Sequence, residues 1–130
     1  MRLADVVRIL DAKPLLRGYD AELQVVFGAA ADLMSDVLSF ARPGAVLLTG
    51  LTNPQVVRTA DVAAVTAIVF VRGKIPPAET IELAEEVNIP LFWTSLTMFD
   101  ACGRLYEAGL RHHFVESGKG LARCDSEIIG

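Results

Sequence analysis

Short apolar runs alternate with helical patterns along most of the chain. Four runs are continuously apolar and bounded by turn residues, namely 23–27, 45–49, 67–71 and 90–93. Continuous rather than alternating hydrophobicity is typical of parallel strands that are buried on both faces. A pattern with helical spacing follows each run. Strand and helix therefore alternate four times, which predicts a parallel sheet with right-handed crossovers.

The helices are predicted from apolar residues spaced three and four positions apart. An opening helix contains Leu3, Val6, Val7 and Leu10 on one face. It should end near Lys13-Pro14, because proline disfavours helix in the residue before it. The later stripes are Leu33, Met34, Val37, Leu38 and Ala41; Val56, Val57, Ala60, Ala63 and Ala64; Ile81, Ala84 and Val87; and Met98, Phe99, Cys102, Leu105, Tyr106 and Gly109. We predict an α/β fold: a single three-layer domain with a mainly parallel sheet of about four to five strands flanked by helices.

The predicted domain covers residues 1–110, and the remaining residues, 111–130, break its pattern. This last stretch carries two adjacent histidines, a Ser-Gly-Lys-Gly sequence and scattered charges. We interpret it as an appended tail or a short hairpin.

Composition narrows the possible functions. The chain has 130 residues, 52% of them hydrophobic and 22% charged, which excludes disorder. A net charge of −4 argues against nucleic-acid binding, which needs a basic face. The longest apolar run, 60–71, falls short of the roughly 18–20 residues that span a membrane. We expect a cytoplasmic protein with no membrane or nucleic-acid partner.

Candidate metal ligands are few. Cys102, His112, His113 and Cys124 have no recognised zinc-site spacing. Two cysteines are also too few for a disulfide scaffold. We therefore expect neither a metal nor a cofactor.

Residues suited to ligand binding follow the predicted strands. In open parallel sheets, ligands bind beyond the carboxyl ends of the strands. The residues that we expect to contact a ligand there are Gly28, Gly50, Thr52, Asn53, Arg72, Lys74, Thr94 and Ser95. Their small size, hydroxyl groups and positive charges suit a small anionic ligand, such as a nucleotide or a phosphorylated metabolite.

The loop after the second run is the most informative of these. Asn53 is a good N-cap, Pro54 suits the first helical position, and Gly50 permits a tight turn. A helix N-terminus presents free N–H groups and a positive dipole end, which attract anions. The alternative is ordinary helix capping, the role that we also assign to Asp32.

The cations and hydroxyls of the last two loops have functional and structural interpretations. Arg72 and Lys74 suit a phosphate or carboxylate, and the alternative is that they are solvated loop residues. Thr94 and Ser95 suit hydrogen bonds to a ligand. Thr97 is better explained as a helix cap.

Sequence signatures of catalysis are missing. The sequence contains no G-x-x-x-x-G-K-[ST] loop, no G-x-G-x-x-G after the first run and no G-x-S-x-G elbow. Without an assembled nucleophile and base, we expect a protein that is not an enzyme.

Four segments in order resemble the DRTGG domain family in its short stand-alone form. They are 28–38, 47–63 (LLTGLTNPQVVRTADVA), 68–74 (IVFVRGK) and 88–91 followed by 94–105, and the resemblance covers about residues 1–110. The family is similar to the N-terminal domain of HPr kinase/phosphorylase, whose kinase chemistry lies in a separate domain with a phosphate-binding loop. That loop is missing here, and so is a literal DRTGG pentapeptide.

The resemblance implies a regulatory role rather than kinase activity. In other members the domain accompanies CBS pairs or a phosphotransacetylase, which implies regulation, ligand sensing or assembly. Stand-alone members occur beside hydrogenase and redox-complex components.

Two other functions remain open. The first is an assembly subunit, either a homodimer or a partner of another protein, with Phe92, Trp93 and Phe114 as exposed contact residues. The second is a small phosphotransfer enzyme that acts at the same carboxyl edge through Asn53, Thr94 or Ser95.

Overall fold

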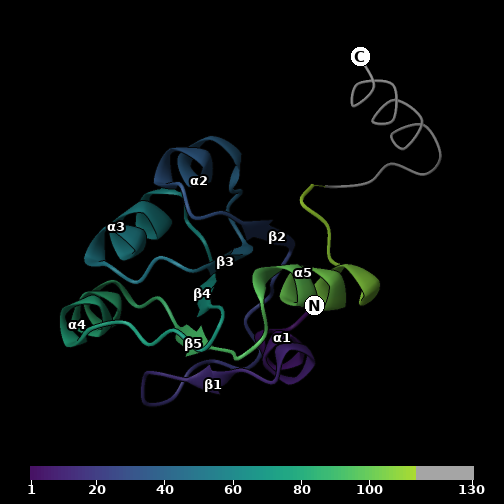
Figure 1. The fold of residues 1–130 in the computed structure, drawn as a ribbon, viewed down its shortest axis with the longest axis horizontal. Helices are drawn as coiled ribbons and strands as arrows, with labels where there is room; N and C mark the ends of the chain where they lie inside the picture. The colour runs from purple at the N-terminus through teal and green to yellow at the C-terminus, as the bar shows by residue number, and fades with distance from the viewer. Residues whose placement is uncertain (114–130) are drawn as a thin grey trace.

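The computed structural model describes residues 1–113, which form a layered α/β domain (Figure 1). Its elements in chain order are α1 (Leu3–Leu10), β1 (Lys13–Pro14), β2 (Phe27–Ala30), α2 (Met34–Phe40), β3 (Ala45–Thr49), α3 (Pro54–Val62), β4 (Ala67–Phe70), α4 (Ala78–Val87), β5 (Leu91–Trp93) and α5 (Met98–Glu107). The predicted class, a three-layer domain with a mainly parallel sheet, is confirmed.

One five-stranded sheet runs through the domain in the order β1-β5-β4-β3-β2. The strands β2 to β5 are parallel, and each lies beside its neighbour in sequence. In the middle of the sheet, Leu47 pairs with Ile68, which in turn pairs with Leu91. Only β1 is antiparallel, at the edge next to β5. All four parallel strands therefore end at the same edge of the sheet.

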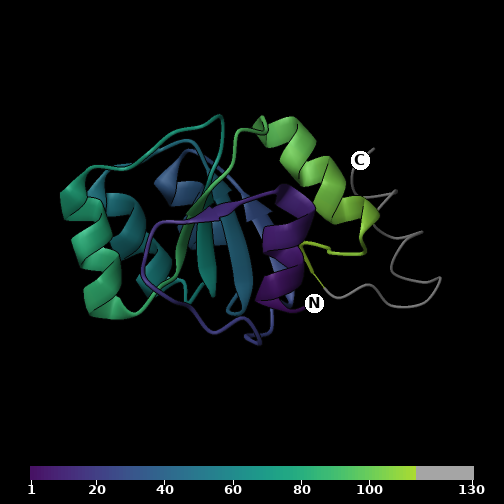
Figure 2. The ribbon, with the colours of Figure 1, turned by 90° about the horizontal axis from the view of Figure 1, so that it is seen from below.

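Helices cover both faces of this sheet. The helices α2, α3 and α4 lie on one face, and α1 and α5 lie on the other (Figures 1 and 2). Successive side chains of a strand point to opposite faces. Accordingly, Val46 and Leu48 pack with the α1–α5 layer, whereas Ala45 and Leu47 pack with the other layer. Burial on both faces explains the continuous hydrophobicity of β3 and β4.

The chain leaves β4 and β5 toward opposite faces. After β4 it enters α4, in the layer of α2 and α3, whereas after β5 it enters α5 in the other layer (Figure 2). Adjacent strands with diverging connections form a crevice at the carboxyl edge of open α/β sheets, where ligands commonly bind. The topology thus singles out the loops that follow β4 and β5.

The first parallel strand lies later in the chain than predicted. The apolar run 23–27 predicts a strand, but β2 spans Phe27–Ala30. Before the sheet, the backbone pairs with the start of α1, where the Leu3 N–H donates to the Leu23 carbonyl over 2.8 Å. The prediction was wrong because hydrophobicity alone does not separate a sheet strand from a segment that packs beside a helix.

The opening helix is confirmed, but it ends earlier than predicted. Leu10 is its last residue, and Asp11 follows with φ 49°. Lys13–Pro14 then form β1 at the sheet edge, where a proline is tolerated because it need not donate to the ladder. Asp11 rather than the proline therefore ends the helix, and Pro14 belongs to a strand that the pattern did not predict.

Two helices bury less of their apolar side chains than predicted. In α2 only Val37 is buried, and Leu33 and Leu38 are more than half exposed. In α5, Phe99 and Tyr106 face outward. The apolar side chains of α2 are exposed because this helix lies at the end of its layer, beside the edge strand β2 (Figure 1).

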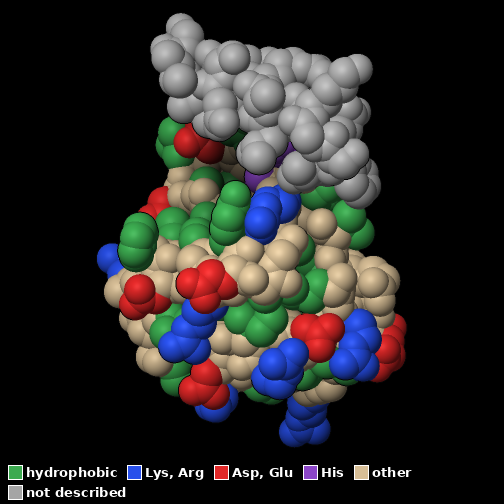
Figure 3. Space-filling view, turned by 90° about the vertical axis from the view of Figure 1, so that its right-hand side faces the viewer, with side chains coloured by type: hydrophobic (Ala, Val, Ile, Leu, Met, Phe, Trp, Pro, Cys, Tyr) green, Lys and Arg blue, Asp and Glu red, His purple; other side chains and the backbone are tan. Residues whose placement is uncertain are grey.

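On the face formed by α1 and α5, charged side chains of both signs are interspersed with hydrophobic ones (Figure 3).

Phe92 belongs to the core rather than to the surface. It is fully buried, and its ring forms an edge-to-face pair with Tyr19 at a centroid distance of 4.9 Å. The prediction that Phe92 is an exposed contact residue is therefore wrong. Trp93 is half-buried, and Phe114 lies outside the described residues.

The described chain ends beside the edge strand β2. After α5, the Arg111 carbonyl accepts a hydrogen bond of 2.9 Å from the Gly28 N–H. The tail or hairpin predicted over 111–130 lies outside the described residues except for its first three. Within residues 1–113, no helix has both the length and the hydrophobicity that a membrane-spanning segment requires.

Candidate functional site

The loop after β4 is a tight turn that is bound to the loop after β5. Arg72 and Gly73 both have positive φ, 60° and 68°. The Arg72 N–H donates to the Leu96 carbonyl, and the Gly73 N–H donates to the Thr94 carbonyl, each over 2.8 Å. Backbone hydrogen bonds therefore join the loops after β4 and β5 and fix the position from which the Arg72 side chain extends.

The Arg72 side chain lies over Gly50, at the end of β3. A Cβ placed on Gly50 would be 2.7 Å from Nη2 of Arg72. Any side chain at position 50 would therefore displace the guanidinium, so glycine permits this close approach. Within residues 1–113, the Arg72 side chain makes no hydrogen bond and no ion pair. The structure thus brings together two of the predicted site residues, and it leaves an unpaired cation between β3 and β4.

A carboxylate faces this cation. Oδ1 of Asp32 accepts hydrogen bonds from the Gly50 N–H (2.7 Å) and the Thr49 hydroxyl (3.2 Å). The same Cβ position on Gly50 is 3.4 Å from Oδ1 of Asp32. The prediction that Asp32 caps the next helix is wrong, because Leu33 occupies the N-cap of α2. Asp32 instead holds the end of β3, and its carboxylate lies beside Gly50, as the Arg72 guanidinium does.

The N-terminus of α3 completes the loop after β3. Asn53 is the N-cap and Pro54 the first helical residue, as predicted, but the Asn53 side chain makes no capping hydrogen bond and is exposed. Thr52 is held in place, because its carbonyl accepts a 2.7 Å hydrogen bond from the buried Thr80 hydroxyl. The helix end carries a partial positive charge. Its dipole and the Arg72 guanidinium therefore both favour an anion.

The two predicted hydroxyls after β5 differ in their environment. Thr94 is 1% exposed; its hydroxyl donates to the Leu10 carbonyl (2.7 Å) and accepts from the Leu96 N–H (3.3 Å). The structure thus places Thr94 inside the fold, where it anchors the end of α1 to β5. Ser95 is exposed in the same loop.

The last two predicted residues lie apart from each other. Lys74 is exposed just after the turn at β4. Gly28 lies inside β2, and a Cβ there would be 3.1 Å from the Leu110 side chain. The prediction that Gly28 follows the strand is wrong, since the strand itself was placed too early.

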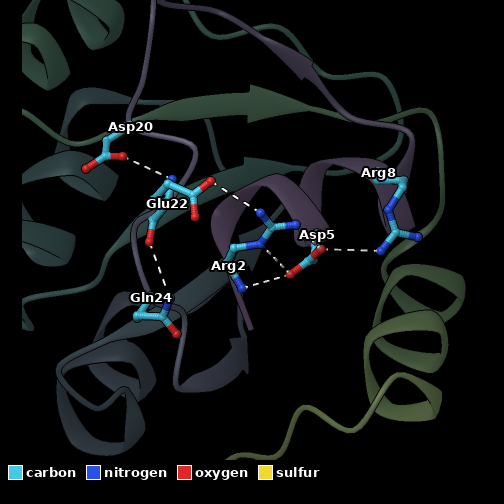
Figure 4. Close-up of polar contacts among 6 residues, drawn as sticks. All are labelled: Arg2, Asp5, Arg8, Asp20, Glu22 and Gln24. Atoms are coloured by element: carbon cyan, nitrogen blue, oxygen red, sulfur yellow. Dashed lines mark hydrogen bonds and ion pairs between the residues drawn. The ribbon is translucent and has the colours of Figure 1, made fainter.

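A larger cavity than those at β2 lies elsewhere, beside α1 and the segment that leads into β2. Its volume is about 630 Å³, and Asp5, Arg8 and Gln24 supply its polar lining. The Arg2 guanidinium and backbone N–H hold the Asp5 carboxylate, and Arg8 approaches it to 3.4 Å (Figure 4). These bonds lower the pKa of Asp5 to about 2.

Sequence reasoning missed this cavity. Its sequence signal is the alternation of basic and acidic residues at positions 2, 5 and 8 of the opening helix. None of the four cavities described within residues 1–113 is lined by Asn53, Arg72 or Lys74. The predicted ligand residues that the structure keeps at the carboxyl edge thus form a surface rather than one of these cavities.

Comparison with known proteins supports the fold. No protein-family model and no curated protein matches the chain. Among solved structures, the chain is similar to the CBS and DRTGG domains of the regulatory region of Clostridium perfringens pyrophosphatase, complexed with the activator diadenosine tetraphosphate. The TM-score is 0.63 at 16% sequence identity, over 91% of this chain and 51% of that one. This chain therefore spans about half the length of the similar chain, and the likeness shows the fold.

Proposed function

We propose that this protein is a non-catalytic regulatory module of the DRTGG type that binds a small anionic ligand at the carboxyl edge of its sheet. Arg72 carries the proposal. Its guanidinium lies over Gly50 without a side-chain partner among residues 1–113. Its backbone is left-handed at φ 60°, a conformation that costs a non-glycine residue roughly 1–2 kcal/mol. Because Arg72 has a strained backbone and its side chain forms no bond within residues 1–113, we assign it a role in binding rather than in folding.

The chemistry around Arg72 favours a phosphate that is attached to a hydroxyl-bearing group. A guanidinium presents paired donors that match phosphate oxygens. The exposed Asn53, Lys74 and Ser95 offer further polar contacts at this edge. Oδ2 of Asp32 makes no hydrogen bond within the described residues and suits a sugar hydroxyl. This pairing of one cation with one free carboxylate oxygen favours a nucleotide over inorganic phosphate.

The structural similarity supports a regulatory module. The similar structure is a regulatory region crystallised with a nucleotide activator, which is a property of that protein. The present chain shares its fold over 91% of its length and lacks a phosphate-binding loop in its sequence. Both facts agree with ligand sensing rather than phosphotransfer.

Thermal unfolding in the presence of ligands tests the proposal. ATP, diadenosine tetraphosphate and inorganic pyrophosphate are titrated against the wild type, Arg72→Gln and Arg58→Gln, which removes another exposed arginine, on α3. A ligand at about 100 times its Kd stabilises the fold by roughly 2.7 kcal/mol, which raises the Tm by several degrees. We expect this shift in the wild type and in Arg58→Gln, and its loss in Arg72→Gln. An equal shift in all three proteins would place the ligand elsewhere.

The role of Asp32 is tested in the same titration. Asp32→Asn removes the charge and keeps a carbonyl oxygen that accepts hydrogen bonds. If the carboxylate binds a sugar hydroxyl, the change should weaken ATP more than pyrophosphate. Equal effects on both ligands would limit Asp32 to holding the end of β3.

A second candidate function is self-assembly through α2. Leu38 and Phe40 on this seven-residue helix are 54% and 61% exposed, and Leu33 at its N-cap is 61% exposed. Clustered apolar exposure of this kind marks interaction sites, and the proposed occupant is the same helix of a second copy. Sedimentation should show a dimer that Phe40→Lys dissociates. The control Phe99→Lys, at a still more exposed position on the other face, should remain dimeric, and a wild type that is monomeric at every concentration would exclude this function.

A further inference from the structure

A cavity opens at the amino-terminal edge of the sheet, opposite the edge that carries Arg72. Its volume is about 360 Å³, and it lies between the loop that follows β1 and the turn that joins α4 to β5. The loop is fixed to the sheet, because the Leu15 N–H donates to the Leu91 carbonyl over 2.9 Å. Ligand-binding cavities commonly have volumes of roughly 300–1,000 Å³. This cavity is therefore large enough for a small molecule, and it is separate from the proposed anion site.

Two opposite charges line this cavity without forming an ion pair. Arg17 comes from the loop after β1, and Glu85 comes from the last turn of α4. Within residues 1–113, neither side chain makes a hydrogen bond or an ion pair. In the cavity beside α1, by contrast, the Asp5 carboxylate already accepts hydrogen bonds from Arg2 and Arg8 (Figure 4). The cavity beside α4 thus offers a cation and an anion that no described residue neutralises.

The backbone on each side of the cavity supports this separation of charge. The C-terminus of α4 carries a partial negative charge, and its last turn contains no basic residue, so an ammonium group is favoured beside Glu85. On the other side, Gly18 turns the loop with a φ of 72°. Asp20, a second carboxylate of the lining, holds that turn by accepting a 3.0 Å hydrogen bond from the Glu22 N–H (Figure 4). The turn carries Arg17, whose guanidinium favours a carboxylate.

Apolar side chains supply much of the remaining lining. Tyr19 is held in place, because its ring packs edge to face on the buried Phe92. The other apolar residues of the lining are Leu16, Leu23, Ile89 and Pro90. A ligand with an apolar side chain therefore has a surface to pack against between the two charges.

We propose that this cavity binds a small zwitterion with an apolar side chain, namely an apolar amino acid or dipeptide. Its carboxylate binds Arg17, its ammonium group lies beside Glu85 and the C-terminus of α4, and its side chain packs on the apolar lining. A ligand with a single charge would leave Arg17 or Glu85 without a partner. The site is independent of the anion site at the carboxyl edge, so the module has a second ligand.

The separation of the two charges distinguishes an amino acid from a dipeptide. In a free amino acid, one Cα atom separates the ammonium group from the carboxylate. Each added residue extends the molecule by at most roughly 3.3–3.6 Å. Leucine and leucylleucine therefore probe a short and a long distance between Arg17 and Glu85 with the same chemistry.

An NMR titration of the isotope-labelled full chain tests the proposal. The probes are leucine, leucylleucine, N-acetylleucine, which lacks the ammonium group, and leucinamide, which lacks the carboxylate. We expect at least one zwitterion to shift the amide signals of Gly18 and Asn88, which line the cavity. Both singly charged analogues should bind at least about fivefold more weakly, because each loses a hydrogen bond between charged groups. The absence of these shifts with both zwitterions, or an analogue that binds as tightly as they do, would overturn the proposal.

Matched variants assign each charge of the ligand to its partner. Arg17→Gln should bind the zwitterion no more tightly than leucinamide, and Glu85→Gln should bind it no more tightly than N-acetylleucine. Arg58→Gln on α3 and Glu79→Gln in the first turn of α4 remove exposed charges of the same signs and should keep the wild-type preference. The amide spectrum of each variant verifies that it is folded. A wild-type preference in both Arg17→Gln and Glu85→Gln would place the ligand elsewhere and overturn the proposal.

Discussion

Replacing Arg72 with glycine separates the conformational cost of this residue from the binding role proposed for it. At φ 60°, a non-glycine residue is destabilised by roughly 1–2 kcal/mol, and glycine removes that cost. The greater freedom of glycine in the unfolded chain offsets about 0.4–1 kcal/mol of this gain. Within residues 1–113, the Arg72 side chain has no hydrogen bond or ion pair to lose. We therefore expect Arg72→Gly to stabilise the fold by about 0.5–1 kcal/mol.

The assay is urea denaturation followed by circular dichroism, with and without ATP. Ala64→Gly is the matched control, because Ala64 is also exposed and has φ 58° but offers no ligand group. Both variants should unfold at higher urea than the wild type. Only Arg72→Gly should lose the additional stabilisation by ATP. Higher stability together with lost binding is the behaviour of a residue retained for function.

Two results would refute this reasoning. If Arg72→Gly is less stable than the wild type while Ala64→Gly is more stable, the Arg72 side chain contributes to folding. Arg72 is then retained for stability rather than for binding. If both variants lose stability, the left-handed conformation carries no cost in this fold.

Other changes probe the hydrogen bonds that support the fold and the site. Thr94→Val should destabilise the domain by about 1–3 kcal/mol in urea denaturation, because it leaves the buried Leu10 carbonyl without its donor, whereas Thr94→Ser should stay close to the wild type. Arg2→Gln should raise the pKa of Asp5 from about 2 toward 3.8 in an NMR titration. Because that pKa is lowered in the folded state, Asp5 stabilises the fold above pH 4 and loses this effect as the pH falls toward 2. The free energy of unfolding of Arg2→Gln should therefore fall less steeply than that of the wild type between pH 4 and pH 2. Gly50→Ala should weaken ATP binding with little change in Tm, since its methyl group displaces the guanidinium above it.

The central strands were predictable because burial on both faces leaves a clear sequence signal. The run 45–49 coincides with β3, and turn residues bound it on both sides. In contrast, β1 consists of Lys13 and Pro14, which become a strand only by pairing with β5, some 80 residues away in sequence. The shift of β2 has the same origin, since tertiary pairing with α1 takes up the first part of its apolar run. Local hydrophobicity thus predicts strands that are buried in the core. It misses strands that form only by pairing with a segment far away in sequence.

The candidate site was predictable as a set of loops but not as a set of contacts. Gly50 and Arg72 follow adjacent strands, so topology alone places them at one edge. That Arg72 lies over Gly50 depends on a left-handed turn with no clear sequence signal, because arginine is unusual in that conformation. Thr94 was assigned to the ligand surface because its partner, the Leu10 carbonyl, lies 84 residues away in sequence.

Calorimetric titration of ATP into the wild type, Arg72→Gln and Arg58→Gln tests the central claim most directly. Hydrogen bonds to charged groups contribute roughly 1.5–3 kcal/mol, so loss of the Arg72 guanidinium should raise the Kd at least about tenfold. We expect one binding site in the wild type, the same Kd in Arg58→Gln, and a Kd at least about tenfold higher in Arg72→Gln. An equal Kd in all three proteins, or a wild type that binds none of ATP, diadenosine tetraphosphate and pyrophosphate, would contradict it.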